Sequence, residues 1–153
     1  MKKILSFVLM LVIAAGLVSC NGILGERGDV SVVIENRDGT YEVYKAYLED
    51  VENRDEGVYG VIEFLMKREK NPLCADIAQS TYGAYVNSIG SLTPDATKNE
   101  YVAIYTSLEG DFGTGEFVKE IEYEDVTLKT AGVGLTSMSA EKGTVILCRI
   151  ETY

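Results

Sequence analysis

The 153-residue sequence contains no histidine and no tryptophan, and it has only two prolines and three cysteines. The absence of histidine removes the commonest general base and the commonest transition-metal ligand. It also rules out a Ser–His or Cys–His arrangement for nucleophilic catalysis. A glycine-rich phosphate loop ending in Lys-Ser/Thr is missing as well. The sequence therefore predicts a protein that is not an enzyme and has no resident metal.

Basic residues are scarce relative to acidic ones. The chain has 14 lysines and arginines against 24 aspartates and glutamates, which gives a formal net charge of −10 at pH 7. An acidic surface of this kind repels nucleic acid and anionic lipid headgroups. We therefore expect no nucleic-acid partner, and we expect any attachment to a membrane to use something other than a basic patch.

The N-terminal residues have the layout of a secretory signal peptide. Lys2 and Lys3 precede an apolar run over residues 4–18, and small residues lead to Cys20. A cysteine at the cleavage point resembles a bacterial lipobox, which implies diacylglycerol on the Cys20 sulfur. The apolar run is shorter than the roughly 20 residues of a membrane span. An ordinary signal peptide cut near Ser19 is the alternative.

These features predict three segments. A signal peptide covers residues 1–19, lipidated Cys20 and a tether cover residues 20–28, and a single folded domain covers residues 29–153. The lipid would hold the chain at the cell membrane on its extracytoplasmic face.

Two cysteines remain after Cys20, namely Cys74 and Cys148. A compartment outside the cytoplasm permits disulfides, and two thiols allow only one bridge. Whether this bridge forms depends on the Cα separation, which the sequence does not supply. The alternative is a pair of buried free thiols that act as small hydrophobic residues.

The first half of the domain predicts a hairpin and then a helix. A β-branched run over residues 30–34 and the pair Asp38-Gly39 favour a hairpin that returns over residues 41–48. Apolar residues then recur at helical spacing and form a single stripe: Val58, Val61, Ile62, Leu65 and Met66. Asn53 or Asp55 is expected to cap this amphipathic helix.

The second half predicts short strands over residues 82–90, 101–108, 118–123 and 144–150, with a helix over 73–82 as a weaker alternative. We expect segment 118–123 to be an edge strand. Residues 109–116 form an acidic, glycine-rich loop whose carboxylates could meet Ca²⁺ but lack the alternation of an EF-hand, so a solvated loop is the alternative. The resulting class is α+β, with one amphipathic helix packed on a mixed or antiparallel sheet.

The helix at 59–66 and the segments 82–92, 99–107 and 127–146 follow one another in a recognisable series. This series resembles the family of bacterial surface domains similar to the C-terminal domain of transcobalamin and intrinsic factor. The resemblance covers residues 29–153 and implies a β-grasp-like fold of the soluble-ligand-binding type with a non-catalytic binding role. Cobalamin is a ligand by this resemblance only. The chain departs from the family at Val102, where tryptophan is frequent, and at Lys142, where aspartate is frequent.

Four tyrosines are the candidate ligand contacts: Tyr82, Tyr85, Tyr101 and Tyr105. Tyr101 and Tyr105 share one face of their strand because strand side chains alternate. A tyrosine offers an apolar ring with a polar tip, which suits contact with a small molecule, a glycan or a protein. The alternative is that these rings fill the core between sheet and helix.

The leading hypothesis is a membrane-anchored binding module that holds a soluble ligand or a surface protein at the cell surface. The alternative is a structural or protein-interaction lipoprotein without a small-molecule site. That protein would use an exposed sheet edge such as residues 118–123 against its partner.

Overall fold

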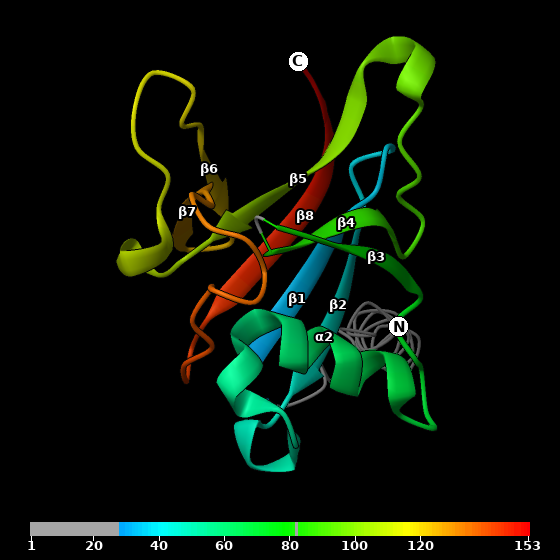
Figure 1. Ribbon diagram of the computed structural model, residues 1–153, viewed down its shortest axis with the longest axis vertical. Coiled ribbons are helices and arrows are strands. Elements are labelled where there is room, and N and C mark those ends of the chain that lie inside the picture. The colour runs from blue at the N-terminus through cyan, green and yellow to red at the C-terminus, as the bar shows by residue number, and fades with distance from the viewer. Residues whose placement is uncertain (1–27, 82) are drawn as a thin grey trace, which may run out of the picture.

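The computed structural model describes residues 28–81 and 83–153 (Figure 1). The predicted signal peptide, Cys20, the tether up to residue 27 and Tyr82 lie outside the described residues. The strands are β1 (Val30–Glu35), β2 (Tyr41–Ala46), β3 (Ala75–Ser80), β4 (Gly83–Ile89), β5 (Glu100–Thr106), β6 (Glu120–Tyr123), β7 (Val126–Thr130) and β8 (Val145–Thr152). The α-helix is α2 (Gly57–Lys67), and the 3-10 helices are η1 (Leu48–Asp50), η2 (Arg54–Glu56), η3 (Ala96–Lys98) and η4 (Glu109–Asp111).

Six strands form one mixed sheet in the order β2-β1-β8-β5-β7-β6, and β3 pairs with β4 in a separate two-stranded sheet. Strand β8 runs parallel to β1, whereas the other neighbours in the large sheet are antiparallel. The α+β class with a helix packed on a mixed sheet is therefore confirmed. The predicted hairpin, helix and final buried strand are confirmed as β1–β2, α2 and β8.

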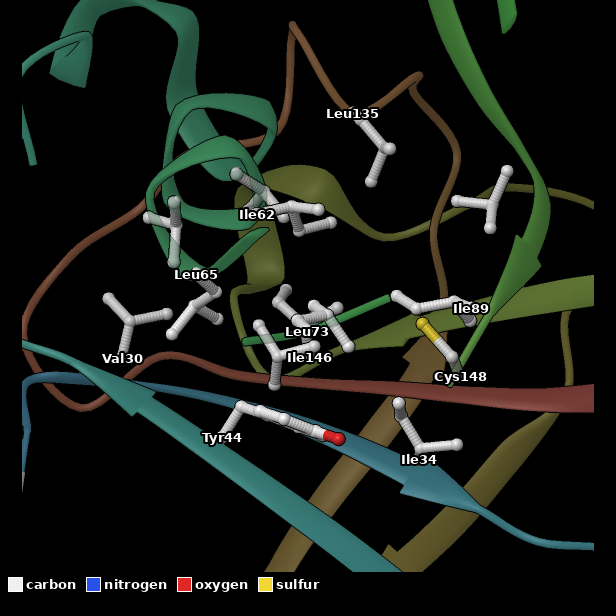
Figure 2. Packing of buried hydrophobic residues seen from close by; sticks show 14 of the residues in the cluster. Val30, Ile34, Tyr44, Ile62, Leu65, Leu73, Ile89, Leu135, Ile146 and Cys148 are labelled. Carbon is white, nitrogen blue, oxygen red and sulfur yellow. The ribbon is translucent and has the colours of Figure 1, made fainter. Parts of the chain in front are cut away.

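Alternating side chains on the strands separate two apolar cores, one on each face of the large sheet. The first core lies between the sheet, α2 and the β3–β4 hairpin (Figures 1 and 2). In Figure 2, Ile62 and Leu65 of the helix lie above Val30 and Ile146 of the sheet. The second core lies on the opposite face and centres on Val33, Ala103, Tyr105, Leu128 and Leu147. This division decides which tyrosines can reach a ligand.

The first N–H groups of α2 donate hydrogen bonds to backbone carbonyls of a later loop. The N–H of Val58 donates to the carbonyl of Met138 at 3.0 Å, and the N–H of Tyr59 donates to the carbonyl of Leu135 at 3.2 Å. Gly57 has a φ of 57°, and a Cβ there would lie 2.0 Å from the Met138 oxygen, so only glycine fits. The predicted Asn53 or Asp55 cap is wrong, because the helix has no side-chain cap.

Two strands escaped the sequence analysis. Residues 75–80 form β3, so the weaker helix alternative over 73–82 is wrong. Strand β7 pairs with β6 through a hairpin that turns at Glu124, whose φ is 51°. That turn contains no glycine, so the usual hairpin signal is missing.

The large sheet curls so that its two edge strands approach each other. Tyr41 of β2 and Tyr123 of β6 make an edge-to-face contact with ring centroids 5.0 Å apart. Strand β6 is an edge strand, as expected for this segment. No helix among the described residues is long and apolar enough to cross a membrane.

Candidate functional site: a groove between β4 and β5

Strand β5 has a complete neighbour on one side only. It pairs with β8 along its whole length, from Glu100 to Thr106. On the other side it pairs with β7 only at Tyr105 and Thr106. The chain then leaves this edge: Ala131 donates to the carbonyl of Ile104, but Gly132 turns away and donates to Asp111. The first four residues of β5 therefore border an open space.

This space is a groove with a cavity volume of about 490 Å³, which lies within the range of small-ligand sites. Its surface is more apolar than polar. The walls come from β4, from β5 and from the segment after β7, and they include Tyr85, Pro94, Tyr101, Val102 and Val133.

Two of the predicted tyrosines meet at this groove. Tyr85 lies on β4 between the buried residues Ala84 and Val86, so its own ring points away from the core and is 52% exposed. Tyr101 lies at the start of β5, and its ring centroid is 5.8 Å from that of Tyr153. Tyr101 is only half-buried and packs against the second core, so Tyr85 is the one of the two whose exposed ring is suited to contact with a ligand.

Tyr105 does not reach the groove. Its side chain is fully buried in the second core, and its hydroxyl donates a hydrogen bond to the carboxylate of Glu151. Burial, followed by this contact with Glu151, raises the pKa of the Tyr105 hydroxyl. Lys119 also binds this carboxylate. Burial alone would raise the pKa of Glu151, but the hydrogen bonds from Lys119 and Tyr105 outweigh it and lower that pKa. Tyr105 is therefore a core residue, but it fills the second core and not the expected core between sheet and helix.

One end of the groove is fixed by the carboxylate of Glu100, which is only 8% exposed. The guanidinium of Arg37 donates two hydrogen bonds to it, at 3.0 and 2.5 Å, and the backbone N–H of Asp95 donates a third at 2.8 Å. The Arg37 contact, then the Asp95 N–H, lowers the pKa of Glu100 from 4.5 to about 2. This carboxylate is therefore ionised and held in place at neutral pH.

Sequence reasoning missed Glu100, Arg37, Pro94 and Val133 as parts of this region. Arg37 lies in the first hairpin and is 63 residues from its partner Glu100. No spacing pattern joins residues so far apart. The composition of residues 130–134 also carried no signal, because the segment is short and glycine-containing.

The cysteines Cys74 and Cys148 are both free in the structure. Cys148 is fully buried, and burial raises the pKa of its thiol to about 12. Cys74 is exposed, so the alternative of two buried thiols is right for Cys148 and wrong for Cys74.

The acidic loop over 109–116 begins with the 3-10 helix η4. Asp111 is buried, and its carboxylate accepts the N–H of Ser139 at 2.9 Å, which ties the loop to the segment after β7. Within residues 28–81 and 83–153 there is no group of three or more histidine, cysteine, aspartate or glutamate residues that could hold a metal ion.

Comparison with known proteins gives a structural likeness and no family. No protein-family model matches the chain, and no curated protein matches it. Among solved structures, the fold is similar to that of a proposed metal-binding protein from Ruminococcus gnavus ATCC 29149, with a TM-score of 0.51 and 14% sequence identity. The match covers 83% of this chain and 99% of that chain. At this level of identity the likeness shows the fold alone.

Proposed function

We propose that this chain is a non-catalytic, lipid-anchored binding module that holds a soluble ligand at the extracytoplasmic face of the cell membrane. The lipid would sit on Cys20, as the lipobox-like sequence predicts. The proposal extends the sequence resemblance to ligand-binding surface domains and does not depend on any single matched residue.

The observation that carries the proposal is the groove between β4 and β5. It combines an apolar lining with an exposed ring, Tyr85, on a hairpin that packs on the first core. Binding sites are usually concave and mostly apolar, with a few polar groups that fix orientation. Asn87 and the held carboxylate of Glu100 are such groups at this groove.

We also propose that the fold is β-grasp-like. A hairpin, a helix across the sheet and a final strand that returns parallel to the first strand support this assignment. The metal binding suggested for the R. gnavus protein is not part of our proposal, since the described residues offer no cluster of metal ligands.

Native mass spectrometry of the full chain, purified gently in mild detergent, tests the proposed function. We expect a co-purifying small mass, or a mass shift on addition of cobalamin or an oligosaccharide, and we expect Tyr85→Ala to lose it. Tyr47→Ala is the matched control, because Tyr47 is also exposed but does not line the groove. A bound mass that survives in Tyr85→Ala would place the ligand elsewhere. A chain that stays free of ligand with every addition would contradict the proposal.

A second candidate function is docking of a protein at the β6 edge. Phe117 stands just before this strand and is 92% exposed, which is unusual for a phenylalanine. The outer residues of β6 include Glu120 and Glu122, and such charges discourage edge pairing. If Phe117→Ser, and not Tyr85→Ala, abolished binding of a purified partner, this second function would replace the first.

A further inference from the structure

Two backbone hydrogen bonds at the ends of β5 show which of its residues bond to β8. At one end Ser107 donates to the carbonyl of Val145, and at the other end Tyr153 donates to the carbonyl of Asn99. In an antiparallel pair, alternate residues exchange hydrogen bonds with the neighbouring strand and the residues between them face the other way. The odd-numbered residues of β5 therefore bond to β8, and the even-numbered residues point their backbone groups away from β8.

The outward N–H and C=O groups of these even-numbered residues face the groove. The carbonyl of Ile104 is used by Ala131 at 2.8 Å, and the N–H of Glu100 donates to Asp95 at 3.3 Å. Ala131 therefore stands opposite Ile104, and among the described residues no partner is placed for the N–H and C=O of Val102. Val102 is nevertheless only 9% exposed. A donor and an acceptor in such a position favour a partner that restores their hydrogen bonds.

We propose that this groove binds an extended peptide, which adds to β5 as an antiparallel strand in line with β7. This inference rests on the proposed binding function and names its ligand class. An extended backbone presents both a donor and an acceptor opposite Val102 at strand spacing. The open stretch runs from Glu100 to Ala103, because Ala131 stands opposite Ile104, and it spans about 10 Å, enough for roughly four peptide residues.

The net charge of the chain indicates which kind of peptide strand can pair with β5. A second copy of this protein would bring another net charge of −10 against the first, which opposes pairing of two copies. A peptide with basic residues at its ends is attracted by the same field, and the attraction weakens with salt. The occupant is therefore a foreign segment with positive net charge.

The walls of the groove define which side chains the peptide needs. Val102 and Ile104 direct their side chains toward the first core, on the side where β4 lies. An added strand would direct alternate side chains the same way, onto Tyr85 and Val133, both of which are exposed now. These alternate positions should be apolar, whereas the positions between them can be polar.

Amide hydrogen exchange, measured by NMR on the full chain in mild detergent, tests the inference. The probe is a blocked eight-residue peptide of alternating valine and threonine with a lysine at each end. Without peptide, the Val102 amide should exchange faster than the Ala103 amide, which bonds to β8. At a peptide concentration ten times the Kd, exchange at Val102 should slow about tenfold, while Ala103 changes little.

A backbone-modified peptide is the matched control. The same sequence with N-methyl groups on the residues that face Val102 keeps its side chains but loses the donor. We expect it to give no protection. Protection by the N-methylated peptide, or no protection at Val102 with millimolar unmodified peptide, would overturn the inference.

Failure of the inference can be distinguished from failure of the proposed function. If a small molecule binds in a Tyr85-dependent manner and the Val102 amide stays unprotected with peptide, the proposed binding function stands and the peptide is the wrong ligand class. If neither a small molecule nor the peptide binds, both fall.

Discussion

The two halves of β5 lie in the same sheet but have different surroundings. Tyr105 and Thr106 at its end have a strand on each side and are fully buried. Val102 near its start has β8 on one side and the groove on the other. Side chains alternate between the two faces of the sheet along the whole strand, so the face on which a residue lies follows the same rule in both halves. What differs is the neighbour at the edge, and that neighbour is set by where β7 ends.

The largest expected effect is at the buried half. Tyr105→Ala should lower the free energy of unfolding by about 3–5 kcal/mol, because it leaves a cavity in the second core. Tyr105→Phe keeps the ring and loses only the hydrogen bond to Glu151, which should cost about 1.5–3 kcal/mol. Urea denaturation measures both. Equal stability of Tyr105→Ala and wild type would mean that Tyr105 is not part of the core.

A pair of proline variants compares the two sides of β5 directly. Ala103→Pro removes an N–H that bonds to β8 and leaves a buried carbonyl without its donor, which should cost about 1–3 kcal/mol. Val102→Pro removes an N–H that faces the groove, and proline is tolerated where a strand N–H faces solvent. Thermal unfolding of the two variants should therefore rank Val102→Pro as the more stable. The opposite ranking would place the Val102 amide against β8 and reverse the phase of the ladder.

The carboxylate of Glu100, at the open half of β5, makes the stability of the protein depend on pH. Its pKa falls from 4.5 to about 2 on folding because of Arg37 and the Asp95 N–H, so its stabilising effect is complete above about pH 5 and is lost as the pH falls toward 2. Glu100→Gln should thus be less stable than wild type at pH 7, and the difference should shrink between pH 5 and pH 2. Urea melts at several pH values measure this difference, and a gap that stays constant down to pH 2 would refute it.

The smallest expected effect on stability is at Tyr85. Because its ring is half exposed on the outside of β4, Tyr85→Ala should change the free energy of unfolding by no more than about 0.5 kcal/mol. Tyr47→Ala should be similarly mild. A large loss of stability in Tyr85→Ala alone would show that the ring supports the hairpin, and its effect on binding would then need another explanation.

The sequence predicted those elements whose signal is local. The Asp38-Gly39 turn and the apolar stripe of α2 each lie within a short window, so β1, β2 and α2 followed from period and turn chemistry. Strand β3, with the sequence Ala-Asp-Ile-Ala-Gln-Ser, has little β propensity and forms because it pairs with β4.

The groove could be predicted only in part. Tyr85 and Tyr101 were candidates because of their residue type and their predicted strands, and both line it. The same reasoning selected Tyr105, because period two places it on the face of Tyr101 but does not say that the second core covers that face. No local sequence pattern predicts the ion pair between Arg37 and Glu100 or the point at which β7 ends, because both depend on tertiary structure.

The position of β8 has a consequence for when the molecule can fold. It is the last strand along the chain, yet it lies between β1 and β5 near the middle of the sheet. A nascent chain that lacks Val145–Thr152 has β1–β2 and β5–β7–β6 but nothing to join them. Pairing of such distant segments is slow because the intervening loop must close first. The polypeptide should therefore remain open until the residues of β8 are available to pair, and this order of events would suit the export across a membrane that we propose.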